Sequence, residues 1–199
     1  MDAHFFATVS RMKYIERWAL MRSSRPENLS EHSLEVSMIA HALCTIGNVR
    51  YNRNLNAERA ALIGLYHDAS EIITGDMPTP VKYFNADIRS AYKEVEAVAN
   101  QKLIDQLPED LKSAYTKILM EPEDPDENTR LMYRLVKAAD KLSAYIKCIE
   151  EERSGNQEFR TAKQTIERSL DQMAEELPEV WDFMKDFLPS YGKTLDELT

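Results

Sequence analysis

Glycine is scarce in this sequence, and so are the β-branched runs that alternate with polar residues in exposed strands. Only 5 of the 199 residues are glycine. Ala, Leu, Glu and Lys, in contrast, are abundant, and these residues favour helices. This composition offers few strand patterns. It therefore disfavours a β-rich fold and predicts an all-α protein.

Cysteine is almost absent, and no long apolar segment is present. The two thiols, Cys44 and Cys148, have no CxxC or zinc-ligand spacing. We therefore interpret them as reduced core residues of a cytoplasmic protein. No apolar stretch approaches the ~20 residues that are needed to cross a bilayer. The N-terminal region has charged residues at short intervals and no export signal, so we expect no membrane attachment.

Basic residues are outnumbered by acidic ones. The 25 Lys and Arg residues against 34 Asp and Glu residues give a net charge of −9. An acidic chain disfavours a long polyanion such as DNA, and a single nucleotide is the more natural anionic substrate. Binding would then need a local positive pocket, which Arg17, Arg22, Lys82 and a metal ion could supply.

The length fits one domain with a sizeable core, covering residues 1–199. Apolar periodicity and helix start and stop signals place eight helices along it. The predicted ranges are 3–18, 29–46, 57–67, 69–74, 87–107, 109–120, 129–153 and 156–187. The predicted starts are Asn28, Asn56 and Asp87, and the predicted stops are Gly47 and Gly155.

His67 and Asp68 stand side by side at the end of an apolar helical stretch, and His32 and Asp140 lie elsewhere in predicted helices. Two imidazoles and two carboxylates form a mixed nitrogen and oxygen set that suits cobalt, manganese, zinc, iron or nickel. A cation with few protein ligands keeps open positions for a phosphoryl oxygen and a water. With Glu71 beside it to handle protons, this set outlines a hydrolytic metal site.

Helical periodicity supports some of these residues and not others. His32 lies one turn before Val36 on the apolar stripe of its helix, so its ring is predicted to point inward. His67 falls on the same side as Gly64, where a small residue would let a neighbouring element approach. Asp140 lies nearly opposite the strong apolar stripe of its helix. This position makes Asp140 a solvated residue, unless that helix is packed on both sides.

Simpler interpretations stay open at this point. A histidine on an apolar face is more often a core residue than a ligand, and Asp68 with Glu71 matches a helix-capping pattern. Trp18 could stack on a ligand, or it could belong to the core. Arg17 could be an ordinary surface residue of the first helix.

The wider sequence resembles a known family. The order of His32, His67-Asp68 and Asp140 resembles the HD-domain metal-dependent phosphohydrolases, and the surrounding motifs are similar to the bacterial HD-domain 5′-deoxynucleotidases. The stretch 66–85 is the most specific. The motifs are His4-Phe-Phe, Arg17-Trp18, Leu20-Met-Arg22, Ser30-Glu-His-Ser-Leu34, Tyr66-His-Asp-Ala-Ser-Glu71, Thr74-Gly-Asp76, Pro78-Thr-Pro-Val-Lys-Tyr-Phe-Asn85, Val136-Lys137, Ala139-Asp140 and Ala144-Tyr145. Ala19 stands where the family has proline, and the segment 153–188 matches loosely.

The resemblance implies a single HD-domain helical bundle with the metal site in its core, between helices. It implies one divalent cation, with cobalt or manganese favoured, and a homodimer. The implied metal ligands are His32, His67, Asp68 and Asp140. Glu71 would be the acid/base group. Arg17 would orient the phosphate, a task that suits a guanidinium because its planar fork binds phosphate oxygens in pairs.

A stiff loop is predicted after Glu71, because the segment 75–80 contains a glycine and two prolines. The resemblance implies that this loop lies against the sugar and phosphate, as a wall that rejects a 2′-hydroxyl. The alternative is a turn that only connects two helices. The implied substrate-binding residues are Arg17, Trp18, His32, Asp76, Met77, Pro78 and Thr79.

The sequence as a whole is interpreted as an HD-domain enzyme that removes the 5′-phosphate of 2′-deoxyribonucleoside monophosphates. A second interpretation keeps the site but makes it a phosphodiesterase or a triphosphohydrolase. The lack of a second metal-ligand set, such as an extra His-His pair, weakens the phosphodiesterase version. A third interpretation is a nucleotide-binding regulatory module with an inert site. The presence of Glu71 and of all four metal-ligand candidates argues against it.

Overall fold

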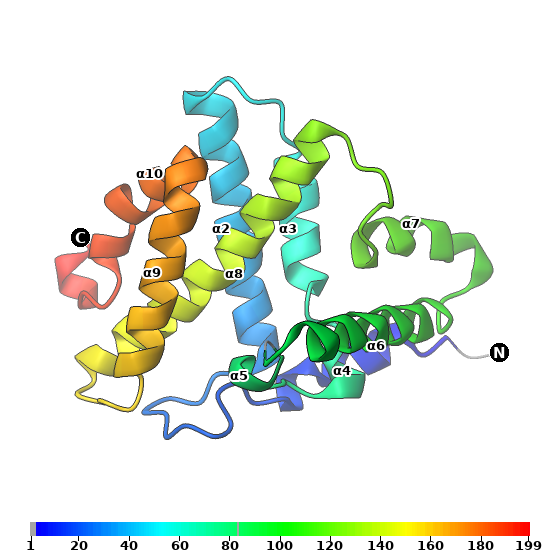
Figure 1. Cartoon of the computed structure of the whole chain (residues 1–199), viewed down its shortest axis with the longest axis horizontal. Coiled ribbons are helices and arrows are strands. Elements are labelled where there is room, and N and C mark those ends of the chain that lie inside the picture. The colour runs from blue at the N-terminus through cyan, green and yellow to red at the C-terminus, as the bar shows by residue number, and fades with distance from the viewer. Residues whose placement is uncertain (1–2, 83) are drawn as a thin grey trace.

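The computed structural model describes residues 3–82 and 84–199, with only the backbone of Thr79 described. Within these ranges the protein is built of helices, and its only bridge pairs Glu16 with Asn28 (Figure 1). The α-helices are α1 (Phe5–Val9), α2 (Leu29–Arg50), α3 (Ala57–Tyr66), α4 (Glu71–Thr74), α5 (Thr79–Lys82), α6 (Ala86–Ile104), α7 (Glu109–Leu119), α8 (Glu127–Arg153), α9 (Arg160–Glu176) and α10 (Pro178–Asp186). The prediction of an all-α protein is confirmed.

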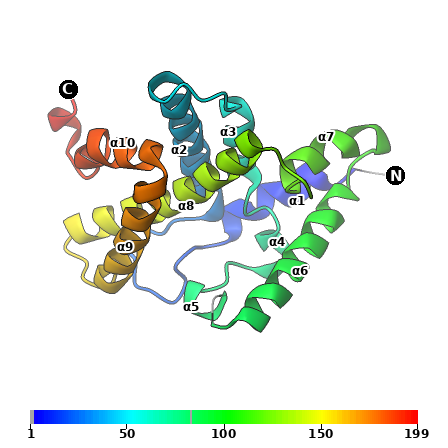
Figure 2. The same cartoon turned by 45° about the horizontal axis from the view of Figure 1, so that its top comes forward.

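Helix α2 is the centre of the arrangement. It packs against α3 and α8, while α9 packs on α8, and α10 covers α2 and α9. Figures 1 and 2 show α9 and α10 on the side of the C-terminus, with α6 and α7 on the side of the N-terminus. None of the helices in the described ranges combines the length and the apolar character of a membrane span.

Two clusters of buried apolar side chains divide the interior. The larger one joins α2, α3, α8, α9 and α10, and the smaller one joins α1, α4, α6 and α7. On α2, Leu29 belongs to the smaller cluster and Val36 to the larger. On the next helix and the turn after it, Ile63 belongs to the larger cluster and Ala69 to the smaller. The segments that carry His32 and His67-Asp68 therefore cross the boundary between the two clusters.

Several helix boundaries follow the predicted signals. The Asn28 side chain accepts hydrogen bonds from the backbone N–H groups of Ser30 and Glu31, and the Glu31 side chain completes the capping box. Asn56 caps α3 through the backbone N–H of Arg59. Gly155 has a positive φ of 83° directly after α8, the left-handed conformation that ends many helices.

Other boundaries were predicted wrongly. The first predicted helix, 3–18, stops at Tyr14 after a 3₁₀ turn, and an irregular segment follows to Asn28. Gly47 does not end its helix, because the chain continues in α2 to Arg50. Asn85, rather than Asp87, caps α6. The predicted helix 156–187 is two helices, with Pro178 at the first turn of α10, where its missing N–H costs nothing.

Helices α2 and α3 approach each other closely at Gly64, as its small size predicted. A Cβ atom built on Gly64 would lie 3.0 Å from the Cα of Ser37 and 3.1 Å from its backbone nitrogen. Since both atoms are backbone, neither can move aside without shifting α2. Gly64 therefore sets the distance between the helix that carries His32 and the helix that leads to His67.

We expect Gly64→Ala to destabilise the protein. Alanine in a helix is ordinarily favoured over glycine by about 1 kcal/mol, but here the added methyl group must separate α2 from α3. Overpacking of this kind costs about 1–3 kcal/mol. Chemical denaturation should therefore show a lower free energy of unfolding for the variant.

Gly47→Ala is the matched control, because it changes the other glycine inside a helix. The atoms nearest its added Cβ belong to the side chains of Leu55, Glu179 and Arg53, which can adjust. This variant should unfold at the same denaturant concentration as the unmodified protein or at a higher one. Equal stability of the two variants would contradict the close-packing argument.

Candidate metal centre

His32 lies in the first turns of α2 and is completely buried. Its Nε2 atom lies 3.1 Å from Oδ1 of Asp140 and 3.6 Å from Oδ2 of Asp68. The inward orientation predicted from the apolar stripe is what the structure shows. The ring presents Nε2 to two carboxylates, a geometry that suits a ligand better than an ordinary core histidine.

His67 follows the last residue of α3. Its Nδ1 atom lies 2.7 Å from the carbonyl oxygen of Gly64, and a carbonyl can only accept. The proton of the neutral ring is therefore on Nδ1, which leaves the Nε2 lone pair facing the cluster. This Nε2 lies 3.0 Å from Oδ2 of Asp68.

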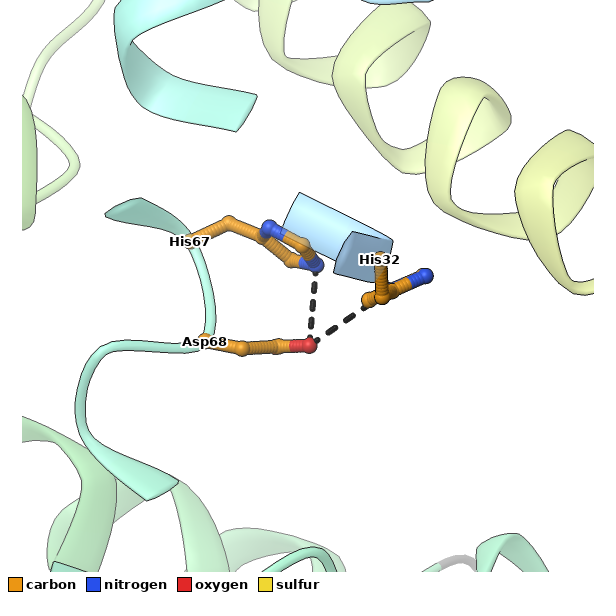
Figure 3. Close-up of side chains that lie close together, drawn as sticks. All are labelled: His32, His67 and Asp68. Atoms are coloured by element: carbon orange, nitrogen blue, oxygen red, sulfur yellow. Dashed lines mark ion pairs between the residues drawn. The ribbon is translucent and has the colours of Figure 1, made fainter. Parts of the chain in front are cut away.

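The ligand atoms of His32, His67 and Asp68 all lie within 4.8 Å of one another. Figure 3 shows the Asp68 carboxylate reaching toward both rings. Although both Nε2 atoms are buried, neither has a hydrogen-bond partner of good geometry among the described residues. Two buried, unpaired ring nitrogens beside carboxylate oxygens form a donor set that fits a borderline divalent cation.

Asp140 joins this cluster from α8. Its Oδ1 atom also approaches the Nε2 of His67, at 3.9 Å. The interpretation as a solvated residue is only partly right: the side chain is 44% exposed, but the carboxylate faces the histidines because α8 is packed on both sides. Leu135 and Leu142 are buried on one face, and Val136 and Ser143 are buried on the other.

Burial and neighbouring charges shift the pKa values of the residues in the cluster. Burial, together with the positive charge of Arg17, lowers the pKa of His32. Burial also opposes protonation of His67, but the carboxylates of Asp68 and Asp140 outweigh it and raise the pKa of His67 to about 9. Desolvation by its neighbours opposes ionisation of Asp140, yet the nearby His32 and His67 rings lower its pKa. The site thus favours positive charge at its centre.

Glu71 is the first residue of α4 and is buried. Its Oε2 atom has no hydrogen-bond partner in the described part of the chain. Burial raises its pKa to about 9, and the negative charges of Asp68 and Asp76 act in the same direction. The capping interpretation of Asp68 and Glu71 is wrong: α4 starts after Ser70 and has no side-chain cap, and Asp68 faces the histidines.

Arg17 lies after the first helical segment, not on it, and its side chain is only 12% exposed. Its Nη1 atom donates to Oε2 of Glu27 at 2.8 Å and lies 2.9 Å from Nδ1 of His32. The carboxylates of Asp68, Asp76 and Asp140 are close enough to raise its pKa against the effect of burial. The surface interpretation of Arg17 is therefore wrong.

Trp18 has a positive φ of 59°, an uncommon conformation for a bulky residue. Its indole N–H donates to Glu27, and its ring meets Phe159 edge-on with centroids 5.2 Å apart. The ring is half-buried. Trp18 is thus partly packed, against Phe159 and with the Arg17 guanidinium 5.6 Å from its ring centroid, and the choice between core and stacking residue stays open.

A buried ion pair anchors the segment that carries Arg17 and Trp18. Lys147 and Glu151, one turn apart on α8, are 5% and 1% exposed. Glu151 accepts a hydrogen bond from the backbone N–H of Ser24 at 2.7 Å, and Lys147 donates to the carbonyl of Arg25. The helix that supplies Asp140 therefore also holds this segment in place.

The loop after α4 brings Asp76 and Met77 to half-buried positions, with Pro78 exposed. Burial raises the pKa of Asp76, opposed by Arg17 and by a hydrogen bond from the Trp18 backbone. The segment is not loop throughout, because α5 begins at Thr79, whose side chain lies outside the described structure. Of the other predicted cations, Arg22 pairs with Glu158 on the surface and Lys82 with Glu96.

Three neighbours of the cluster escaped the sequence reasoning. Glu27 holds Arg17 and Trp18, Ser143 contacts the His32 ring, and Glu35 accepts from Ser143. The last two had a signal in the sequence. Glu35 follows His32 by three residues, and Ser143 follows Asp140 by three, so each shares a helix face with a candidate ligand.

The fold is that of the HD-domain phosphohydrolases. An HD-domain phosphohydrolase from Listeria innocua superposes with a TM-score of 0.80 at 24% identity, covering 96% of this chain and 90% of that one. The cyanophage S-2L HD phosphohydrolase DatZ, solved with dA and one catalytic Zn²⁺ ion, superposes with a TM-score of 0.62 at 20% identity, covering 94% and 96%.

Within this class the chain belongs to the 5′-deoxynucleotidase YfbR-like family, whose model matches residues 4–191. The 5′-deoxynucleotidase of Erwinia tasmaniensis is 51% identical over 199 residues, which cover 100% of this chain and 98% of the relative. The 5′-deoxynucleotidase YfbR of Escherichia coli K12 is 50% identical over 198 residues, covering 100% and 96%. The resemblance seen in the sequence motifs is confirmed.

We expect Asp140→Ala to lower the content of bound divalent metal while leaving the fold intact. Removing the carboxylate takes away an oxygen donor and a negative charge that favours a cation. Metal analysis after dialysis, with circular dichroism as the check on folding, would measure the effect. Asp124→Ala, at a fully exposed aspartate (98% exposed side chain), is the control. Equal metal content in the two variants would count against Asp140 as a ligand.

Proposed function

We propose that this chain hydrolyses 2′-deoxyribonucleoside 5′-monophosphates to deoxyribonucleosides and phosphate in a metal-dependent reaction. The observation that carries the proposal is the convergence of two imidazoles and two carboxylates beside a largely buried arginine and a buried glutamate. The full-length relatives at 50–51% identity are named 5′-deoxynucleotidases. The DatZ structure, with its dA and catalytic Zn²⁺, supports a nucleotide ligand for this fold.

His32, His67, Asp68 and Asp140 would hold one divalent cation, for which we propose cobalt or manganese. When bound, such a cation polarises a phosphoryl oxygen and lowers the pKa of an adjacent water. The two ring nitrogens and the carboxylate oxygens are already directed at one another, so little rearrangement of the side chains is needed.

Arg17 would orient the phosphate. Its guanidinium is held by Glu27 on one side and lies beside His32 on the other. A guanidinium remains protonated throughout a reaction and can bind two phosphoryl oxygens at once. Held in this position, Arg17 would also stabilise the charge that accumulates on those oxygens.

Glu71 would act as the acid/base group. A carboxyl group whose pKa is raised by burial can hold a proton near neutral pH and exchange it with a neighbouring oxygen. In its protonated form Glu71 would donate a proton through Oε2 to the 5′-oxygen of the leaving nucleoside, and in its ionised form it would take up the proton of the attacking water.

The substrate-binding set would consist of Arg17, Trp18 and His32 together with the segment Asp76, Met77, Pro78 and Thr79. The half-buried Trp18 ring would offer a stacking surface for a base or sugar. A close wall at residues 76–79 would oppose a 2′-hydroxyl. Walls of this kind usually discriminate against an added hydroxyl by a factor on the order of a hundred.

The alternative activities receive less support. A two-metal phosphodiesterase needs a second ligand set, whereas His32, His67 and Asp68 form the one group with metal-ligand spacing among the residues described. An inert regulatory module would not require a buried, unpartnered Glu71. We further propose that residues 1–199 form one domain, that the protein is a homodimer and that it is cytoplasmic. Light scattering in solution would test the dimer.

We expect Glu71→Gln to keep the bound metal and to lower kcat by a factor of roughly 10² or more, the usual size of a general acid/base contribution. The amide fills the same volume but cannot carry the proton. Metal content and steady-state phosphate release would be measured on the same preparation. Glu94→Gln, at an exposed position on α6, controls for the loss of one charge. A rate for Glu71→Gln close to that of the control would remove Glu71 from the mechanism.

The test of the proposed function is phosphate release from matched deoxy- and ribonucleoside mono-, di- and triphosphates with several divalent metals. We expect the 5′-deoxymonophosphates to have the highest kcat/KM and 3′-phosphates to react poorly. Equal kcat/KM values for deoxy and ribo substrates would overturn the sugar selectivity. Fast hydrolysis of the nucleoside triphosphates would favour a triphosphohydrolase.

Variants around the phosphate and the sugar should separate two effects. Arg17→Ala should lower the rate on every nucleotide alike, because the phosphate is common to all. Met77→Ala should instead raise ribonucleotide activity relative to deoxynucleotide activity, because it shortens the wall. An unchanged sugar preference in Met77→Ala would show that the wall lies elsewhere.

A further inference from the structure

The Nδ1 side of the His32 ring, away from the carboxylates, has two polar neighbours. Nη1 of Arg17 lies 2.9 Å from Nδ1, and Oγ of Ser143 lies 3.0 Å from the same atom. Ser143 Oγ in turn lies 2.6 Å from Oε2 of Glu35. His32 and Ser143 are both fully buried, so water does not replace these partners.

Arg17 and Ser143 require different tautomers of the His32 ring. A guanidinium has only donors, so Arg17 needs a lone pair on Nδ1. A serine hydroxyl has one proton, and Ser143 gives it to the Glu35 carboxylate; it can then only accept from a proton on Nδ1. A neutral imidazole cannot satisfy both, because Nδ1 carries either the proton or the lone pair.

A metal ligand requires one of these two forms. A histidine that offers Nε2 to a cation keeps its proton on Nδ1, and that proton ordinarily has an acceptor behind it. His67 already has this arrangement, with Nδ1 on the carbonyl of Gly64. Ser143 and Glu35 would supply the same arrangement to His32.

We propose that Ser143 and Glu35 are positioning residues that hold the proton of His32 on Nδ1, keep Nε2 available to the cation, and compete with Arg17 for Nδ1. This inference rests on the metal site of the proposed function. Two consequences follow from it. Cation affinity depends on the Ser143 hydroxyl, and a cation-loaded His32 releases Arg17 from Nδ1, which frees that guanidinium for the phosphate.

The two helices make the support possible. Glu35 stands one turn after His32 on α2, and Ser143 stands one turn after Asp140 on α8. Helix α8 therefore supplies both a candidate ligand for the cation and the support for another ligand. Burial raises the pKa of Glu35 to about 7, and the hydrogen bond from Ser143 acts in the opposite direction. Measurements at pH 8 would find this carboxylate mainly ionised.

The first experiment measures the Zn²⁺ dissociation constant of the full chain by competition with a chelator at pH 8. We expect Ser143→Ala to weaken binding by roughly 10- to 100-fold, the usual effect of removing a group that supports a ligand. Ser33→Ala is the matched control. Ser33 is also a buried serine of this region, next to His32, but its hydroxyl has no hydrogen-bond partner among the described residues.

Variants of Glu35 test whether it acts through Ser143. Glu35→Gln keeps an acceptor for the hydroxyl and should weaken Zn²⁺ binding less than Glu35→Leu does. Combining Glu35→Leu with Ser143→Ala should be no worse than Ser143→Ala alone, because the chain of hydrogen bonds is already broken. Additive losses in this double variant would overturn the proposed relay.

The second experiment observes the ring proton directly. The chain has 4 histidines, so ¹⁵N-histidine NMR spectra of the metal-free protein can be assigned by substitution. Ser143→Ala should shift His32 toward the tautomer protonated on Nε2, because Arg17 is then its only Nδ1 partner. Arg17→Ala should shift it the opposite way. A shift in the wrong direction for either variant would overturn the proposal, and a purely structural effect would move neither tautomer.

The outcomes separate this inference from the function on which it rests. If the unmodified protein binds neither Zn²⁺ nor Co²⁺ nor Mn²⁺, the proposed metal site fails. If it binds Zn²⁺ and Ser143→Ala binds as tightly as Ser33→Ala, the metal site stands and the role of Ser143 is wrong.

Discussion

The contact between α2 and α3 at Gly64 is the constraint on which the site depends. Because the glycine packs against the backbone of Ser37, the start of α2 and the end of α3 are held at a fixed separation. This separation places the His32 and His67 rings beside each other, with their centroids 5.3 Å apart. A separation set by backbone contact is less adjustable than one set by side chains, which can change rotamer.

This fixed geometry brings several carboxylates together. Glu27, Asp140, Asp68 and Asp76 all lie close enough to Arg17 to raise its pKa against the effect of burial. The carboxylates of Asp68 and Asp140 raise the pKa of His67, whereas burial, followed by the charges of Asp68 and Asp76, raises the pKa of Glu71. A bound cation would offset the repulsion among these carboxylates.

The sequence predicted the parts of this picture that depend on local pattern. The apolar stripe placed His32 inward, the small residues of α3 indicated the close approach, and the asparagine caps marked two helix starts. Periodicity could not predict that Asp140 joins the cluster, because whether a helix is covered on one face or two depends on its neighbours in space. The end of the first helix was missed for a similar reason, since the Lys147–Glu151 pair holds the following segment from a distant part of the chain. The residue pattern gave Asp140 and Arg17 only as candidates, and the family resemblance supplied the roles expected of them.

The anchoring of residues 15–28 has a consequence for the thermodynamics of ligand binding. Trp18 is held in a sparsely populated backbone conformation by contacts to Glu27 and Phe159, and α8 holds the backbone of Ser24 and Arg25 through part-buried hydrogen bonds. The conformational entropy of this segment is therefore lost when the chain folds, and not when a nucleotide arrives. Preorganisation of this kind leaves more of the contact energy to appear as affinity, and the cost of the strained tryptophan is carried by the stability of the whole fold.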